Sequence, residues 1–371
     1  MTRQDPLAVA ALRAGSVEAR EPLARAAGDD PWLRGELARV IACQNLRPGD
    51  PEEALAMLDR IARPAPEHQG LHAQLAFAAG DRARAGGLLR AHPAVPEAVR
   101  TALLVDLANP YAGGTGPWRF ADLLPAPAVR VADGPGDPFD RLTTGPAQRI
   151  GHPVRITTVV TTYRPGPGLL TAVRSLTAQT WTNHEILVVD DGSPHGHDDV
   201  LRRTAALDPR VRVLRLPVNG GTYVARNAGL DAATGDFVTF QDSDDWSHPL
   251  RLERQVAPLL ADPAVFSTTS AGMRVTPQLL VSRVGFAQTR SYNLSSLMVR
   301  RAVALSRLGH LDPVRKGADA EYVERARAVF GRPATRHLDG EPLALIRLSP
   351  ESLSSADYRP GWMHPARRSY L

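Results

Sequence analysis

The chain beyond residue 153 alternates short, continuously apolar runs with amphipathic helical stretches, and this alternation constrains the fold more than any other feature. Strands are predicted at residues 154–162, 185–190, 211–216 and 236–240, with helices between them. A strand that is apolar along its whole length must be covered on both faces, which is typical of parallel sheets in α/β domains. We therefore predict an α/β fold with a mainly parallel sheet and helices on both faces.

Polar and acidic side chains stand at the predicted carboxyl ends of three of these strands. The first strand ends in Thr-Thr-Tyr at residues 161–163, the second in Asp-Asp-Gly-Ser at 190–193, and the fourth in Gln-Asp-Ser-Asp-Asp-Trp at 241–246. In open α/β sheets, ligands bind beyond the carboxyl ends of the strands. The three groups are therefore expected on one rim of the sheet.

A glycine pair and an arginine lie between the last two groups. Residues 219–221 (Asn-Gly-Gly) run into a predicted helix that carries Arg226, and the first turn of such a helix can face an anion. The carboxylates of Asp242, Asp244 and Asp245 repel one another unless a cation lies among them. Carboxylate oxygens suit Mg²⁺ or Mn²⁺, and an arginine suits the charge that remains on a diphosphate. This combination predicts a divalent cation that bridges a diphosphate.

Residues 1–108 form a different region, rich in Ala, Leu and Arg and with the apolar periodicity of helices. Gly-Asp pairs at residues 49–50 and 80–81 each precede a similar helical stretch. Their spacing is close to the ~34 residues of tetratricopeptide-type hairpins, which this region resembles in degenerate form. A packed all-α domain and a peptide-binding solenoid both stay open, because Gly-Asp before a helix is also an ordinary cap.

Residues 109–153 are rich in Pro, Gly, Thr and Asp, a composition that breaks periodic structure. We predict a linker with little regular structure, in which Trp118, Phe120, Leu123 and Leu124 can fasten it to a flanking domain. The predicted organisation is a helical domain at 1–108, this linker at 109–153, an α/β domain at 154–350 and a tail at 351–371.

Composition excludes several classes of protein. No window of the 371 residues approaches the ~18 consecutive apolar residues that a membrane-spanning helix needs. Cys43 is the only cysteine, which excludes an intramolecular disulfide framework and a cysteine-based zinc site. The net charge is +5, but 43 of the 44 cationic side chains are arginines scattered among acids, so nucleic-acid binding is not predicted. The N-terminus lacks a basic and apolar secretory leader, so a cytoplasmic location is expected.

Six segments of the α/β region resemble, in order, the motifs of family 2 glycosyltransferases, which have the A-type nucleotide-sugar fold. The second, Ile-Leu-Val-Val-Asp-Asp-Gly-Ser at residues 186–193, matches almost letter for letter. The resemblance covers residues 154–350 and implies a Rossmann-like A-type sheet, preceded here by a smaller all-α domain. The six segments lie at residues 159–163, 186–193, 225–230, 242–245, 293–301 and 317–326.

The resemblance implies roles for the matching side chains on the donor side. Thr161 and Tyr163 are expected to line the nucleobase pocket, and Asp191 to accept a hydrogen bond from the base. Arg226 and Asp242 are expected to contact the nucleotide.

The resemblance also implies a metal site and a catalytic base. Asp242 and Asp244 are expected to hold ribose and metal, with Asp244 as the direct ligand of Mn²⁺ or Mg²⁺. Asp319 is expected to deprotonate the acceptor hydroxyl, which gives a single displacement with inversion.

Two positions depart from the family pattern. Arg164 stands where the family usually has Asn, and Ala318 stands where Glu is common. The second departure leaves Asp319 as the expected base, with Glu321 or Glu324 as alternatives if the helix register differs.

Asp191 further constrains the nucleobase. An ionised carboxylate only accepts hydrogen bonds, so it selects a base that presents an N–H on its pairing edge. Uracil and thymine present N3–H, whereas cytosine has an unprotonated acceptor there. We therefore expect UDP or dTDP sugars first, GDP sugars second and CDP sugars last.

The sequence thus predicts a cytoplasmic, metal-dependent, inverting glycosyltransferase of polysaccharide biosynthesis that acts on a glycan, a lipid-linked or a small-molecule acceptor. Peripheral association with the inner face of the membrane is compatible with this function. The helical domain is expected to bind a partner or to self-associate. Two alternatives stay open: a non-catalytic helical-repeat adaptor with an inactive nucleotide-binding domain, and a haloacid-dehalogenase-like phosphatase that uses the carboxylates at 242–244.

Overall fold

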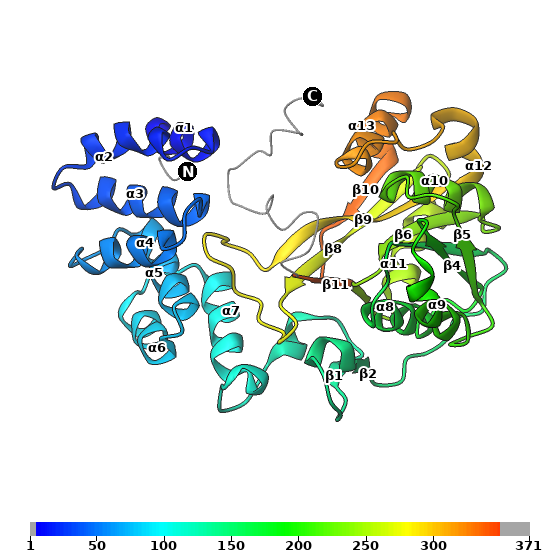
Figure 1. Cartoon of the computed structure of the whole chain (residues 1–371), viewed down its shortest axis with the longest axis horizontal. Coiled ribbons are helices and arrows are strands. Elements are labelled where there is room, and N and C mark those ends of the chain that lie inside the picture. Colours follow the sequence, from blue (N-terminus) through cyan, green and yellow to red (C-terminus); the bar gives the residue numbers. More distant parts are fainter. Residues whose placement is uncertain (1–4, 349–371) are drawn as a thin grey trace. The chain divides into compact units, whose positions relative to one another are not determined.

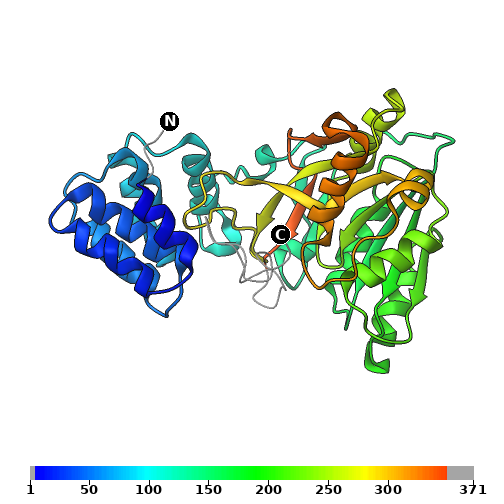
Figure 2. The same cartoon turned by 90° about the horizontal axis from the view of Figure 1, so that it is seen from above.

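The computed structural model describes residues 5–348 as two compact units (Figures 1 and 2). Within that range, the helical unit comprises residues 5–119, Gln278–Thr289 and Leu348, and the sheet unit comprises Phe120–Pro277 and Arg290–Arg347. The predicted tail at 351–371 lies outside the described residues. No helix within residues 5–348 is long and apolar enough to cross a membrane.

The helical unit confirms the predicted all-α region. Asp5 and Asp30 accept hydrogen bonds from the first backbone N–H groups of α1 and α3, and a proline follows each of them, so both helices begin at well-formed caps. Successive helices pack side by side, α3 on α4 and α5 on α6 (Figure 1). The helices are α1 (Pro6–Ala14), α2 (Glu21–Ala27), α3 (Pro31–Gln44), α4 (Asp50–Asp59), α5 (Pro66–Ala78), α6 (Arg82–Ala91) and α7 (Glu97–Ala108).

Residues 278–289 pack into the helical unit although they lie between two strands of the sheet unit in the sequence. The fully buried carboxylate of Asp106 in α7 accepts hydrogen bonds from the backbone N–H groups of Val281 and Ser282, both at 2.8 Å. It also accepts one from the Ser282 hydroxyl at 2.5 Å. The segment is drawn in yellow beside α7 in Figure 1. A buried carboxylate of the helical unit therefore depends on this segment for its hydrogen bonds.

Two amide side chains hold the ends of the same segment. Asn109 donates to the carbonyl of Gln278 at 2.8 Å. Gln74 donates to the carbonyl of Phe286 at 2.8 Å and accepts from the N–H of Gly285 at 3.1 Å. The helical unit thus binds a segment of its own chain.

Replacing Asp106 with alanine is expected to destabilise the helical unit, because two buried N–H groups of residues 281 and 282 lose their acceptor. An unsatisfied buried group costs about 1–3 kcal/mol, so we expect Asp106→Ala to lower the free energy of unfolding by about 2–4 kcal/mol. Urea unfolding followed by circular dichroism measures this difference. Asp29→Ala, which removes a fully exposed carboxylate, is the control and is expected to change little. Equal stability of the two variants would contradict the role given to Asp106.

The sheet unit contains a mixed sheet with the strand order β5-β4-β3-β6-β9-β8-β11-β7, and β10 also pairs with β8. The four strands predicted from the sequence correspond to β3, β4, β5 and β6, which run parallel. β9 is antiparallel to β6 and β8, whereas β10 and β11 run parallel to β8. The mainly parallel sheet is therefore confirmed. The strands are β3 (Ile156–Thr162), β4 (His184–Asp190), β5 (Val211–Arg215), β6 (Phe237–Asp242), β7 (Trp246–Ser247), β8 (Ser267–Val275), β9 (Arg290–Arg300), β10 (Thr335–Leu338) and β11 (Ala344–Arg347).

Helices cover both faces of this sheet, as the continuously apolar strands predict. Along β3, Val159 packs with α10 and α13, whereas the next residue, Val160, packs with α8. Figure 1 shows α10 and α13 on one side of the sheet and α8 and α9 on the other. Gly229 lets α10 approach β3 closely, because a Cβ at this position would lie 2.3 Å from Cγ1 of Val159. The helices are α8 (Gly168–Thr177), α9 (Asp198–Ala205), α10 (Thr222–Ala232), α11 (Arg251–Ala261), α12 (Arg301–Val303) and α13 (Ala318–Phe330).

Residues 109–153 carry more regular structure than their composition predicts. They divide at Arg119 between the helical unit and the sheet unit. Phe120 and Phe139 are buried, and β1 (Val129–Val131) pairs antiparallel with β2 (Leu142–Thr144). Buried aromatic side chains thus fasten a stretch rich in Pro and Gly to the sheet unit.

Candidate active site

The parallel pairing of three strands brings the predicted polar residues to one edge of the sheet. In the register of β3 and β6, Thr161 lies opposite Asp242, and in that of β3 and β4, Thr162 lies opposite Asp190. The strand ends therefore stand level with one another, as a nucleotide-binding edge requires.

Asp191 lies directly beyond β4 and is almost completely buried. Its Oδ1 accepts a hydrogen bond from the N–H of Gly220 at 2.9 Å, and its Oδ2 accepts one from the N–H of Gly221 at 2.8 Å. Gly192 follows in the left-handed region, and a Cβ there would lie 2.6 Å from the carbonyl carbon of Val218. Asp191 thus orders the glycine loop before α10, a use that the sequence did not predict.

Two residues at the end of β3 differ in exposure. Thr161 is buried, whereas Tyr163 is 44% exposed. The next residue, Arg164, has φ +51°, and its guanidinium lies 5.1 Å from the centre of the Tyr163 ring. Asn adopts this left-handed conformation more readily than Arg, which gives a physical reason why Asn is common here in the family that the sequence resembles.

An open pocket of about 370 Å³ lies beside the carboxyl ends of β4 and β5. None of the predicted site residues lines this pocket, although its lining residue Gly192 directly follows Asp191. It is lined by Gly192, Ser193, His195, Arg215, Leu216 and Pro217.

Asp242, the first carboxylate of the acidic turn at residues 242–245, is held by donors from two elements. Its Oδ1 accepts from Nη2 of Arg226 in α10 at 2.8 Å. Its Oδ2 accepts from the hydroxyl of Ser295 in β9 at 2.6 Å. Arg226 is 3% exposed, whereas the Asp242 carboxylate is 41% exposed. One side of this carboxylate is therefore fixed by the protein and the other faces solvent.

Asp319 lies in the first turn of α13 and on the other side of the same arginine. Its Oδ2 is 3.8 Å from Nη1 of Arg226, and its side chain is 15% exposed. Burial lowers the pKa of Arg226, but the nearby carboxylates outweigh it and raise this pKa above its ordinary value. Burial and the nearby Asp319 carboxylate raise the pKa of Tyr223. The structure thus brings the residue predicted as the base next to the residue predicted to hold the nucleotide.

The two alternative bases on α13 have other partners. Both Glu321 and Glu324 form ion pairs within the helix, Glu321 with Arg325 and Glu324 with Arg327, each at 2.5 Å. Neither of them contacts Arg226 in the described part of the chain. The helix register therefore favours Asp319.

The other two carboxylates of the acidic turn lie in a strongly negative environment. Burial and the Asp242 carboxylate raise the pKa of Asp244 to about 6. Asp245 is buried and accepts from the N–H of Arg347 at 3.0 Å. Burial and the neighbouring carboxylates raise its pKa further, well above the ordinary value. A cation beside Asp244 would relieve this repulsion.

The described residues do not form a complete metal site by themselves. Within residues 5–348, no group of three or more His, Cys, Asp or Glu side chains is placed to hold a metal ion. Mg²⁺ and similar ions are commonly held by one or two carboxylates together with water and substrate phosphates. Asp242 and Asp244 fit a metal that arrives with a diphosphate.

Residues 157–305 match the family model described as Glycosyl transferase family 2. The chain contains a family 2 glycosyltransferase domain. The model covers β3 to β9 and so includes the strand ends, the glycine loop and the acidic turn, but not Asp319.

Several curated relatives match part of this chain. The uncharacterized glycosyltransferase YibD of Escherichia coli is 35% identical over 29% of this chain and 31% of its own length. The putative teichuronic acid biosynthesis glycosyltransferase TuaG of Bacillus subtilis is 32% identical over 31% of this chain and 45% of its own. The succinoglycan biosynthesis protein ExoO of Rhizobium meliloti is 39% identical over 27% of this chain and 28% of its own. The chain thus matches less than half of the length of each of these relatives.

Some solved structures also resemble part of this chain. TarS 1-349 of Staphylococcus aureus in complex with UDP-GlcNAc has a TM-score of 0.43 and 18% identity, over 55% of this chain and 61% of that one. Glucosyl-3-phosphoglycerate synthase of Mycobacterium tuberculosis, in complex with Mn²⁺, UDP and glucosyl-3-phosphoglycerate, has a TM-score of 0.39 and 19% identity, over 53% of this chain and 74% of that one.

A buried arginine supports the acidic turn from inside the glycosyltransferase domain. Arg251 in α11 is 1% exposed and donates to the side chains of Gln241 (2.9 Å) and Ser247 (2.8 Å), which flank the turn. It also donates to the carbonyl of Phe240 at 2.7 Å. Burial lowers the pKa of Arg251 to about 10, which the carboxylates of the turn partly oppose. No sequence pattern indicates a role for Arg251, because Gln241, Phe240 and Ser247 lie in other elements.

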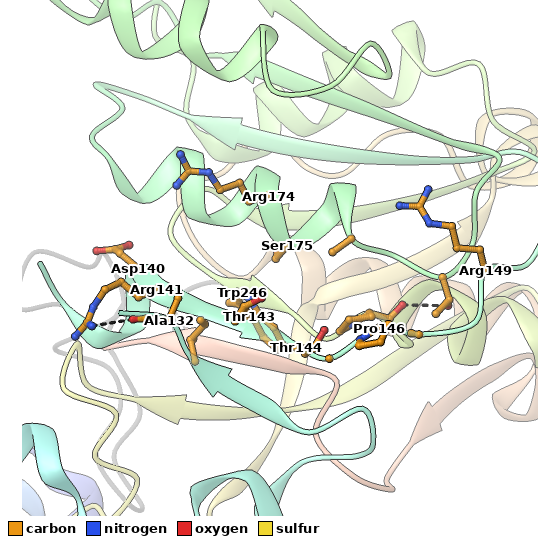
Figure 3. Close-up of a pocket in the computed structure, with 16 residues that line it drawn as sticks. Ala132, Asp140, Arg141, Thr143, Thr144, Pro146, Arg149, Arg174, Ser175 and Trp246 are labelled. Carbon is orange, nitrogen blue, oxygen red and sulfur yellow. Dashed lines mark hydrogen bonds between the residues drawn. The ribbon is translucent and has the colours of Figure 1, made fainter. Parts of the chain in front are cut away.

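A second pocket, of about 650 Å³, lies between residues 140–149 and the second half of α8 (Figure 3). None of the site residues predicted from the sequence lines it. The acidic turn instead faces the start of α8, where a Cβ at Gly168 would lie 3.7 Å from Cα of Asp244. In Figure 3 the guanidinium groups of Arg149 and Arg174 lie well apart and do not converge on one point. This pocket of the sheet unit is therefore not the candidate donor site.

Proposed function

We propose that the protein is a metal-dependent, inverting glycosyltransferase that moves a sugar from a nucleoside diphosphate to an acceptor hydroxyl. The observation that carries this proposal is the buried arginine Arg226, which bonds Asp242 at 2.8 Å and lies 3.8 Å from Asp319. A donor-side carboxylate and a candidate base thus stand on either side of one cation. The names of TuaG and ExoO, which refer to the biosynthesis of two polysaccharides, support a glycan as the acceptor.

Asp242 and Asp244 are proposed to hold the metal and the ribose, with Asp244 as the direct metal ligand. A bound Mn²⁺ or Mg²⁺ supplies charge neutralisation for the leaving diphosphate. Burial and the Asp242 carboxylate raise the pKa of Asp244 to about 6, and a cation bound beside Asp244 would favour its charged form. Both oxygens of Asp242 accept hydrogen bonds, which does not suit the free nucleophile of a phosphatase.

Asp319 is proposed to act on the acceptor. As the acceptor oxygen attacks the anomeric carbon, its proton passes to the Asp319 carboxylate and the bond from that carbon to the diphosphate oxygen breaks. Attack on the face opposite the leaving group inverts the configuration. Asp319 has 15% of its side chain exposed, so an incoming hydroxyl can reach it.

Asp191 is proposed to recognise the base. Each of its oxygens accepts one backbone N–H, and a carboxylate oxygen has a second lone pair for the N3–H of uracil or thymine. Cytosine presents an acceptor at the same place, which a carboxylate repels. A UDP or dTDP sugar is therefore the proposed donor.

Asp244→Ala is expected to abolish metal-dependent nucleotide binding, because Asp242 alone leaves the coordination of the cation incomplete. Isothermal titration calorimetry with UDP, in the presence and absence of Mn²⁺, measures this binding. Asp199→Ala, an exposed acidic residue on α9, is the matched control and is expected to bind as the unmodified protein does. Unchanged Mn²⁺-dependent affinity in a folded Asp244→Ala protein would remove Asp244 from the site.

Asp319→Asn is expected to separate binding from chemistry. The variant keeps a side chain of the same shape, so the affinity for Mn²⁺ and UDP is expected to stay within about threefold. Transfer is expected to slow by about 10² to 10⁴, which is the usual contribution of a positioned general base. UDP release from a panel of UDP-sugars with candidate acceptors measures the rate, and Glu321→Gln is the control. Equal losses of affinity and rate would give Asp319 a structural role instead.

UDP is expected to bind at least about tenfold more tightly than CDP in the presence of Mn²⁺, because a poorly matched carboxylate costs about 1–3 kcal/mol. Asp191→Ala is expected to lower the affinity for both nucleotides, since the N–H groups of Gly220 and Gly221 lose their acceptor. It is also expected to reduce the ratio of the UDP affinity to the CDP affinity. Calorimetry on both proteins with both nucleotides gives the four affinities. Equal affinity of the unmodified protein for UDP and CDP would refute the proposed role of Asp191.

A further inference from the structure

β9 is irregular at the point where it passes the candidate site. Its pairing with β6 ends at Met298, which lies opposite Thr239, and its register with β8 shifts between Thr268 and Ser270. At this shift the hydroxyl of Ser296 accepts from the N–H of Ser270 at 2.8 Å, so that a side chain satisfies this N–H. Irregularities of this kind re-aim side chains next to active sites.

The irregular stretch directs two consecutive serines to different partners. Ser296 is fully buried, and its hydroxyl donates to the carbonyl of Asn293 at 2.6 Å. Ser295 instead donates to Oδ2 of Asp242 at 2.6 Å and lies 3.3 Å from Nη2 of Arg226. Ser296 therefore satisfies backbone groups at the irregularity, whereas Ser295 contacts the acidic turn.

Ser295, Asp242 and Arg226 form a closed set of hydrogen bonds. Nη2 of Arg226 donates to Oδ1 of Asp242 and to the hydroxyl of Ser295, which in turn donates to Oδ2 of Asp242. The Asp242 side chain is 41% exposed, so packing alone does not fix its orientation. Donors from α10 and β9 fix it instead, one on each oxygen.

We propose that Ser295 is a positioning residue, which holds the Asp242 carboxylate in the orientation that binds the metal–nucleotide complex. This inference rests on the proposed function. A hydroxyl suits the task because it fixes the oxygen without neutralising the carboxylate, whereas a second cation there would compete with the metal. Each oxygen keeps a lone pair for the ligand.

The test compares Ser295→Ala, Ser295→Thr and a control in the same strand. Ser291→Ala is the control, because the Ser291 hydroxyl donates to the carbonyl of Gly272 and contacts none of the site residues in the described part of the chain. Calorimetry gives the Kd for UDP with Mn²⁺, steady-state kinetics with a UDP-sugar gives KM and kcat, and thermal unfolding gives Tm without ligand.

Ser295→Ala is expected to raise the Kd and the donor KM about tenfold, in line with the loss of one hydrogen bond to a charged group. The kcat at saturating donor is expected to change less than threefold, and Tm is expected to stay within about 2 °C. Ser295→Thr, which keeps the hydroxyl on a residue that strands favour, is expected to restore the affinity. Ser291→Ala is expected to match the unmodified protein.

The measurements distinguish failure of the proposed function from failure of the positioning role of Ser295. If the unmodified protein binds no nucleoside diphosphate with any divalent cation, the proposed function fails and this inference fails with it. If the unmodified protein binds and Ser295→Ala binds equally well, only the positioning role is overturned. Equal weakening by Ser295→Ala and Ser295→Thr, or a matching fall in Tm, would overturn it as well, because either result would mean that packing and not the hydroxyl is what matters.

Discussion

The buried guanidinium of Arg226 is the interaction on which the candidate site depends. It is a desolvated cation that lies over the rings of Tyr223 and Phe240, each at 5.4 Å, and it is compensated by Asp242 and Asp319. Burial of this charge is tolerated because carboxylates lie beside it, and Asp242, at 2.8 Å, is the nearer of the two. Arg226 sits on α10, whose distance from the sheet is set by the close approach of Gly229 to β3. The packing of α10 on β3 therefore helps to place the Arg226 charge beside Asp242 at the end of β6.

The sheet and the level of its strand ends could be predicted because both follow from local patterns. Continuously apolar strands demand cover on both faces, and parallel pairing puts residues such as Thr161 and Asp242 opposite each other. The family could also be predicted, because six motifs occur in the expected order, and three of them, at residues 159–163, 186–193 and 242–245, lie at these strand ends. The strands β7 to β11 could not be predicted, because they lack a continuously apolar run. β8, for example, is buried along its whole length but consists largely of Ser, Thr and Gly.

The hydrogen-bond partners of the site residues could not be predicted from the sequence, because they lie far apart along the chain. Asp191 was expected to face a base, and it also holds the glycine loop through backbone N–H groups about 30 residues away. Ser295 contacts Asp242, which lies 53 residues earlier in the sequence, at the irregular part of β9. Periodic sequence patterns do not predict such an irregularity. The linker at 109–153 has apolar anchors that the sequence predicts, namely Trp118, Phe120, Leu123 and Leu124. Its two short strands, at 129–131 and 142–144, could not be predicted, because they depend on contacts that composition does not encode.

The segment at 278–289 has a consequence for the order in which the protein can fold. The helices α1 to α7 leave the ribosome before the sheet unit, and domains generally fold as they emerge. Yet the backbone groups that satisfy Asp106 lie 175 residues and more further along the chain. During synthesis, the Asp106 carboxylate therefore lacks these hydrogen bonds until residues 281 and 282 have been made, which is after most of the sheet unit. The helices α1 to α7 precede the sheet unit in the chain, but the hydrogen bonds of Asp106 can form only after residues 120–277 have been synthesised.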